Sequence, residues 1–477
     1  MPVKKTIAKH PSRAGNSMRE IARTTATERR ALQKDVANTA LTMTPLGPLR
    51  SYIGMATASG PIDYKWAIIN PHALLWLLCE KNPAMRVMLH RYCNDKDAGL
   101  VLYADGTTPG NKLAAWGTRE LICWYWTFAA FPSWVRAREH GWFVLGTMAA
   151  TRQKTILGEA SGVAKHILQE LFLCGTGVNF SRGYQLSPFL RIRASLSCFL
   201  LDGLAHKYIT STKGASGKIC CMLCRNIVNT ARSAIDRRKQ QKHYSVATRA
   251  DCILHTHDSF CAEVDRLASI RGHVTKAEFA KQEINIGLVY DEHAITHAPT
   301  LRDVYSVTKH TYFDAMHCLL TSGGVAQWEV NAFLVKAVKL PHSPKITLAL
   351  LDSWRAAIHR PKHHPYLIKD FAQKRVVMQA DKHHLKSFAG ECMSFLPQVV
   401  LLWQRMFQPD GLMLAEGRCL ELLLYPSLRF GSMFHYVSTA RCAAVWLATV
   451  AQRNRSPHYY RRCPHCTVHR RTHVRRH

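Results

Sequence analysis

The sequence is short of acidic residues. Asp and Glu together number 32 against 64 Lys and Arg, which gives a formal net charge of +32. A basic excess of this size favours a polyanionic partner, because each neutralised phosphate of a nucleic acid releases condensed counterions. We therefore expect a nucleic acid as the partner, with an anionic membrane surface or ribosomal RNA as the alternatives.

The sequence also lacks the signals of several common protein classes. The basic, polar N-terminal segment contains no apolar stretch of the kind found in secretory signal peptides. The longest apolar stretch, Leu121 to Val135, is interrupted by Pro132 and is too short to cross a bilayer. There is no Walker A loop, no dinucleotide-binding glycine fingerprint and no nucleophile motif in a recognised context. We expect a soluble protein that has no membrane partner and no small-molecule substrate.

The composition is that of a folded protein. The chain has 477 residues, 47% of them hydrophobic, with 11 Trp and 17 Phe, which is enough to build a substantial core. This length suits one large domain with an insertion, or two to three ordinary domains. The 16 cysteines include Cys-x-x-Cys pairs. In a long chain without a signal peptide, such pairs indicate metal binding in a reducing compartment rather than disulfides.

Apolar runs in the first half of the chain predict a mixed sheet. We expect strands at 98–105, 121–131 and 142–148 and in the run that ends at Asp202, with a helix at 161–173 that Ser161 caps. The order strand, strand, strand, helix, strand is that of an RNase H-like core. Acids stand at the ends of its first and fourth strands, at Asp105 and Asp202. Neighbouring central strands would bring both carboxylates together, where they can hold two divalent ions about 4 Å apart. The alternative is that each is a cap or turn residue.

A second group of residues has the chemistry of a zinc site. Cys221 and Cys224 have the spacing of a zinc knuckle, and tetrahedral zinc needs two more ligands. His310 and His317 are the first choice for these ligands. A rival local cluster is formed by Cys252, His255, His257 and Cys261. Reduced cysteines that pack as small hydrophobic residues remain the alternative.

The rest of the chain is predicted to be mainly helical and basic. One helix at 323–338 contains Glu329, and Glu391 lies near the start of a long apolar segment at 385–408. The expected organisation is a basic tail (1–45), the first part of an RNase H-like core (46–210), a Cys/His-rich zinc insertion (211–320), a helical completion of the core (321–450) and a basic Cys/His tail (451–477). The last of these contains a second Cys-x-x-Cys, Cys463 and Cys466, which we interpret as part of a nucleic-acid-binding tail.

Four stretches carry a resemblance to a known family. They are YADGTTPGN around Asp105, LLDGLAHK at Asp202, STKGASGKICCMLC, and YFDAMH before a helix. A weaker fifth stretch is LKSFAGECMSFLP. Together and in this order they resemble transposases of the CACTA and Plavaka/KDZ group, which are cut-and-paste enzymes with an RNase H-like catalytic domain. The third resembles the Lys-Gly…Cys-x-x-Cys segment of that group, and the fourth resembles its Asp-x-Met-His motif.

This resemblance implies a set of site residues. Asp105 and Asp202 would be catalytic and would bind Mg²⁺ or Mn²⁺. Structural zinc would be bound by Cys221, Cys224 and His317. The third acid would be Glu391, with Glu329 as the runner-up, and Asp314 would have a structural role.

The function that follows is metal-dependent cleavage and strand transfer on DNA. This activity would place the protein in the nucleus and leaves its oligomeric state open. The first alternative is a catalytically inactive, transposon-derived nucleic-acid-binding protein. A weaker alternative is a hydrolytic nuclease that uses the same carboxylates without joining strands.

Overall fold

The computed structural model describes most of the chain between residues 41 and 429. The described residues are 41–58, 60–107, 120–175, 177–231, 242–244, 250–321, 324–341, 345–358, 367–378 and 384–429. The expected N-terminal tail up to residue 40 and the C-terminal Cys463 and Cys466 lie outside them, and so does most of the turn predicted after Asp105.

Both strands and helices are numerous. The strands are β1 Met43–Thr44, β2 Gly47–Pro48, β3 Arg50–Thr57, β4 Gly60–Ile69, β5 Leu100–Thr107, β6 Leu121–Phe128, β7 Phe143–Ala149, β8 Tyr184–Ser187, β9 Leu190–Ile192, β10 Leu196–Leu201, β11 Asn229–Ala231, β12 Lys242–Tyr244 and β13 Thr311–Phe313. The helices are α3 Pro71–Lys81, α4 Pro83–Cys93, α5 Ser133–Arg136, α6 Ala150–Gln153, α7 Glu159–Leu168, α8 Gly203–Ile209, α10 His257–Ile270, α11 Lys276–Ile286, α12 Val307–His310, α13 Ala315–Leu319, α14 Val325–Lys339, α15 Leu348–Ala356, α16 Phe371–Arg375, α17 Ala389–Met406 and α18 Leu414–Arg429.

A five-stranded mixed sheet forms the centre of the first part of the molecule. Its strand order is β13-β10-β5-β6-β7. Strand β6 pairs antiparallel with β5 on one side and with β7 on the other. Strand β10 runs parallel to both β5 and β13. The first three residues of β5, Leu100 to Leu102, are all buried, which is typical of a central strand covered on both faces. The prediction of a mixed sheet flanked by helices is confirmed, and β5 continues past Asp105 to Thr107.

The helix predicted at 161–173 is present, but it begins earlier than expected. Helix α7 starts at Glu159, after Gly158 in a left-handed conformation, so the prediction that Ser161 caps it is wrong. The buried Ser161 hydroxyl instead donates to the carbonyl oxygen of Ile209 at 2.6 Å. It therefore ties α7 to the end of α8, the helix that follows Asp202.

The region between the expected tail and β5 contains elements that the sequence did not indicate. Strands β3 and β4 form an antiparallel hairpin, and α3 and α4 follow it. The hairpin packs beside the outer strand of the sheet, where Trp66 Nε1 donates to the carbonyl oxygen of Thr147 in β7 at 2.8 Å. It thus extends the core beyond β7 without adding a strand to the sheet.

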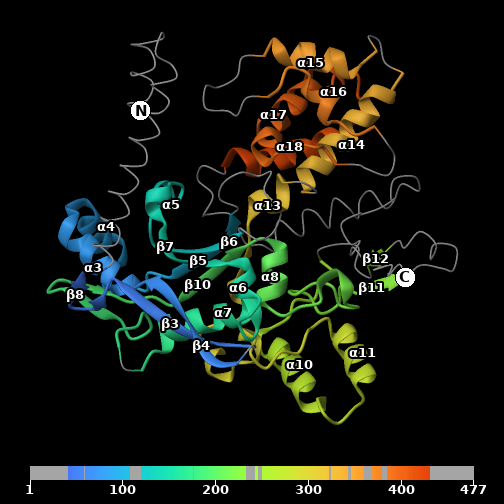
Figure 1. The fold of residues 1–477 in the computed structure, drawn as a ribbon. Helices are drawn as coiled ribbons and strands as arrows, with labels where there is room; N and C mark the ends of the chain where they lie inside the picture. Colours follow the sequence, from blue (N-terminus) through green and yellow to red (C-terminus); the bar gives the residue numbers. More distant parts are fainter. Residues whose placement is uncertain are drawn as a thin grey trace, which may run out of the picture.

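The buried apolar residues form two large clusters. The first runs from Ile53 to Val307 and joins the sheet to α7, α10 and α12. The second runs from Leu319 to Leu423 and is built by the helices from α13 to α18. Figure 1 shows these helices as an orange and red group beyond one end of the sheet, with α13 between the two parts. None of the helices in the described ranges combines the length and apolar character needed to cross a membrane.

Candidate active site

Three aspartates lie in one row at the ends of the parallel strands. Leu200 of β10 pairs with Tyr103 of β5, so two residues further along both strands Asp202 is level with Asp105. On its other side Leu201 pairs with Phe313 of β13, so one residue further along Asp202 is level with Asp314. Neighbouring strands lie about 4.8 Å apart. The strand pairing agrees with the prediction that Asp105 and Asp202 belong to adjacent strands, but Asp105 stands two residues before the end of β5.

The Asp105 carboxylate is half-buried and is held by a tyrosine of its own strand. Residues two apart on a strand face the same side, and the Tyr103 hydroxyl donates to Asp105 Oδ2 at 3.1 Å. The Tyr103 ring in turn lies against Tyr125 and Trp142. Burial raises the pKa of Tyr103, and the charges of Asp105 and Asp314 raise it further. Tyr103 thus remains a hydrogen-bond donor that fixes one oxygen of Asp105 and leaves Oδ1 without a donor among the described residues.

Asp202 caps a helix and keeps one oxygen for another partner. It is the N-cap of α8, and its Oδ1 accepts a hydrogen bond from the backbone N–H of Ala205 at 2.6 Å. The alternative prediction, that Asp202 is a cap residue, is therefore confirmed. It is compatible with a site role as well, because Oδ2 accepts no hydrogen bond from the part of the chain that is described. Capping also fixes the rotamer of the side chain relative to the strand end.

Asp314 and His317 form the third position of the row. Asp314 caps α13 by accepting from the N–H of Met316 at 2.8 Å, and its Oδ2 lies 2.7 Å from Nδ1 of His317. The hydrogen bond to Asp314 raises the pKa of His317, and the charges of Asp314, Asp202 and Asp105 add to the effect. All three carboxylates therefore raise the pKa of His317. The resemblance implies only a structural role for Asp314, and β13 is three residues long, too short to show a strand pattern in the sequence.

The predicted third acid, Glu391, has both oxygens engaged in the second cluster. It lies in the first turn of α17, where Oε1 accepts from Arg375 at 2.9 Å and Oε2 accepts from the N–H of Phe388 at 3.0 Å. The runner-up Glu329 lies in the middle of α14, the helix that packs against α13.

The predicted zinc ligands lie in separate parts of the structure. Cys221 packs against the buried Cys224 in a small apolar cluster. By contrast, His310 Nδ1 accepts from the backbone N–H of Ser306 at 2.9 Å, and burial lowers its pKa to about 4. His317 contacts Asp314 as described above. The contacts of the described residues give no support to a zinc site that combines these two histidines with the two cysteines.

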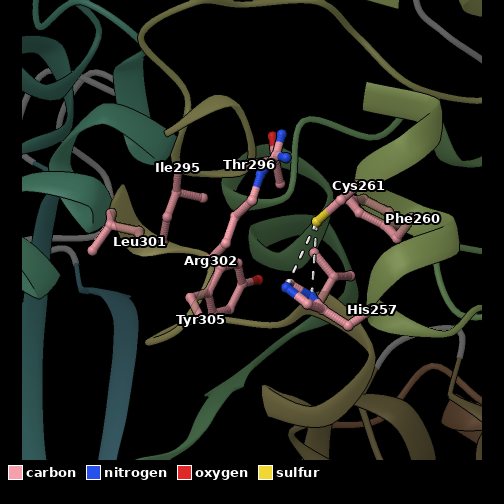
Figure 2. A pocket seen from close by; sticks show the side chains of 9 residues that line it. His257, Phe260, Cys261, Ile295, Thr296, Leu301, Arg302 and Tyr305 are labelled. Carbon is pink, nitrogen blue, oxygen red and sulfur yellow. Dashed lines mark hydrogen bonds between the residues drawn. The ribbon is translucent and has the colours of Figure 1, made fainter. Parts of the chain in front are cut away.

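The rival Cys/His cluster is divided as well. His257 and Cys261 lie one turn apart on α10 and line a small hollow with Arg302 and Tyr305, as Figure 2 shows. The sulfur of Cys261 lies 3.7 Å from Nε2 of His257. Burial raises the pKa of Cys261, which disfavours the thiolate that a nucleophile needs. Cys252 instead packs with the cysteines around Cys224, and the N–H of His255 donates to the carbonyl oxygen of Leu223.

The donor types of the aspartate row suit a hard divalent cation. Carboxylate oxygens are the ligands that Mg²⁺ prefers, and Asp105 Oδ1 and Asp202 Oδ2 are available for this role. Across the described ranges, no three His, Cys, Asp or Glu side chains are already gathered as ligands around one point. A metal at this edge would thus be bound by the two free oxygens together with water or substrate oxygens, as Mg²⁺ sites commonly are. Comparison of the chain with protein-family models and with curated proteins gives no match.

Proposed function

We propose that the chain is a transposase-like DNA-processing protein with an RNase H-like core, which cleaves phosphodiester bonds and transfers strands. The observation that carries this proposal is the row of aspartates on the parallel strands β5, β10 and β13. The chain order of three strands, a helix and a further strand supports it, because the first and fourth of these strands are neighbours. The net charge of +32 supports DNA as the partner and hence the nucleus as the location.

The role of the chain's own residues follows from their contacts. Asp105 and Asp202 present one free carboxylate oxygen each, while Tyr103 and the α8 N-terminus hold the other two. A divalent ion bound there would activate water or a 3′-hydroxyl and neutralise charge on the phosphate. The fixed oxygens reduce the reorganisation needed when such an ion and the DNA backbone arrive. His317, held by Asp314, lies at the same edge and is available to contact a phosphate.

Three residues are candidates for the third catalytic carboxylate. The sequence favoured Glu391 over Glu329, and the structure adds Asp314 as a further candidate. The contacts favour Asp314, because it stands in the row itself, whereas Glu391 is bound to Arg375 and to the backbone of Phe388.

The direct test is cleavage and strand transfer on a labelled DNA duplex with Mg²⁺ or Mn²⁺. Asp202→Asn keeps a side chain that caps helices well but removes its charge, so stability should change by less than about 0.5 kcal/mol. Cleavage should fall by at least about 100-fold, since a group that stabilises the reacting phosphate is lost. The matched control is Asp303→Asn, an exposed aspartate outside the row, which should cleave like the wild type. Equal cleavage by wild type and Asp202→Asn would refute the assignment.

An inactive, DNA-binding descendant of such an enzyme is the second candidate. It is supported by the net charge of +32, which favours phosphate contacts and requires no metal site. This candidate predicts steeply salt-dependent DNA binding with no product in either metal, because affinity would come from phosphate contacts alone. Binding measured at several salt concentrations, beside the cleavage assay, separates the two functions.

A further inference from the structure

The Cys-x-x-Cys of Cys221 and Cys224 has a counterpart later in the chain. Cys252 and His255 are separated by the same two residues, in the stretch DCILHTH. Structural zinc sites are commonly built from two such pairs, each supplied by a tight turn. The sequence alone did not connect these two pairs.

The backbone brings the two pairs face to face. Cys224 and Leu254 form an antiparallel bridge. Beside it, the N–H of Arg225 donates to Ile253 O at 3.0 Å and the N–H of His255 donates to Leu223 O at 2.9 Å. The Asn226 side chain reinforces this pairing, because its amide donates to Asp251 O and its oxygen accepts from the N–H of Ile253. The main chain thus pairs the two turns and brings their side chains close together.

Three of the cysteines belong to one small cluster between the turns. The buried Cys224 lies at its centre, and Cys221 and Cys252 pack around it. The neighbouring Cys220 is oriented differently, since its thiol donates to the carbonyl oxygen of Ile227 at 3.5 Å. The sequence CCMLC therefore offers two of its three cysteines to this cluster.

His255 is oriented as a fourth ligand would be. Its Nδ1 lies 3.2 Å from the hydroxyl of Ser259, and its ring packs edge-on against Phe260. A metal-binding histidine commonly has one ring nitrogen fixed by such a partner, which leaves the other for the metal. Here the nitrogen left for a metal is Nε2.

The core that the described residues form around these turns is small. Its apolar cluster contains only two buried residues, Cys224 and Ile227, with Cys220, Cys221, Leu223 and Cys252 partly buried around them. Small units of this kind are stabilised in other proteins by a structural metal, whose binding energy is folding energy. The two turns have the ligands for such a metal at their centre.

We propose that Cys221, Cys224, Cys252 and His255 bind one structural zinc ion. The set of three thiolates and one imidazole is a standard tetrahedral zinc environment. It replaces His310 and His317, which the sequence favoured, by two residues whose backbone is already paired with that of the cysteines. The described side chains are not yet gathered as ligands around one point, so binding requires loss of the thiol protons and rotation of side chains within a fixed backbone.

The test is the metal content and spectrum of the purified full chain, which require no DNA cleavage and so stand apart from the proposed function. The wild type should hold one zinc ion per chain. Replacing that ion with Co²⁺ should give the absorption of a tetrahedral site, with a sulfur-to-cobalt charge-transfer band of three thiolates. Cys252→Ser and His255→Ala should each weaken zinc binding by more than about 100-fold, beyond the loss expected for an outer-shell partner.

Two sets of variants keep the test decisive. Cys220→Ser and His257→Ala are matched controls beside the proposed ligands and should retain zinc, as should His310→Ala and His317→Ala. Cys252→His guards against a variant that simply fails to fold. It should retain one metal ion, and the charge-transfer band of its cobalt form should fall to the intensity of two thiolates. Full zinc content in Cys252→Ser, or an unchanged cobalt band in Cys252→His, would overturn the proposal.

Discussion

The aspartate row and the cysteine cluster are held in place by opposite means. The row lies at one edge of the sheet, beside strands β5 and β10, and most buried residues of these two strands belong to the larger of the two apolar clusters of the described residues. The cysteine cluster contains two buried residues and depends on a few backbone hydrogen bonds. We expect the first position to persist without any ion and the second to become rigid when its proposed zinc ion binds. A metal at the row would therefore serve chemistry, and a metal at the cysteines would serve structure.

The largest expected effect is that of zinc removal on the two regions. With the zinc chelated, we expect residues 217–231 and 250–256 to lose most of their protection against hydrogen exchange, because the metal supplies their folding energy. Strands β5 and β10 should keep theirs, since their protection comes from the sheet and its core. The measurement is hydrogen exchange followed by mass spectrometry on the full chain with and without the chelator. Equal loss in both regions would show that the cluster supports the sheet as well.

A smaller effect is expected at Glu391. Glu391→Gln keeps an acceptor for the N–H of Phe388 but loses the charge that pairs with Arg375. The free energy of unfolding should therefore fall by about 1 kcal/mol, while DNA cleavage stays within about twofold of the wild type. Denaturant unfolding and the cleavage assay measure the two quantities, with Glu329→Gln as the matched variant on α14. Loss of cleavage without loss of stability would mean that the second apolar cluster supplies the third acid.

The sequence could predict the sheet because its strands are long apolar runs. Four apolar runs, each bounded by turn residues or charges, form the strands β5, β6, β7 and β10. It could not indicate that Asp314 joins the row, since three residues of β13 carry too little pattern and their position depends on pairing with β10. Nor could it assign Ser161 correctly, because a hydroxyl in the first turn of a helix reads as a cap unless its distant partner, Ile209 O, is known.

The zinc ligands show the same limit. His310 and His317 are chemically as suitable as His255, and spacing along the chain does not distinguish them. The distinction comes from the antiparallel bridge between Cys224 and Leu254, a contact between residues far apart in sequence. Local pattern thus predicted a zinc site, and tertiary pairing is what favours the members of the proposed one.

The most direct test of the central claim is Mn²⁺ binding at the aspartate row. The zinc-loaded protein would be titrated with Mn²⁺ and the free ion measured by electron paramagnetic resonance, for the wild type, Asp105→Asn, Asp202→Asn and Asp303→Asn. We predict that both row variants bind Mn²⁺ at least about 10-fold more weakly than the wild type, because each loses one anionic ligand of a hard cation. Asp303→Asn should bind like the wild type. Indistinguishable affinities for all four proteins would contradict the assignment of the sheet edge as a metal-dependent active site.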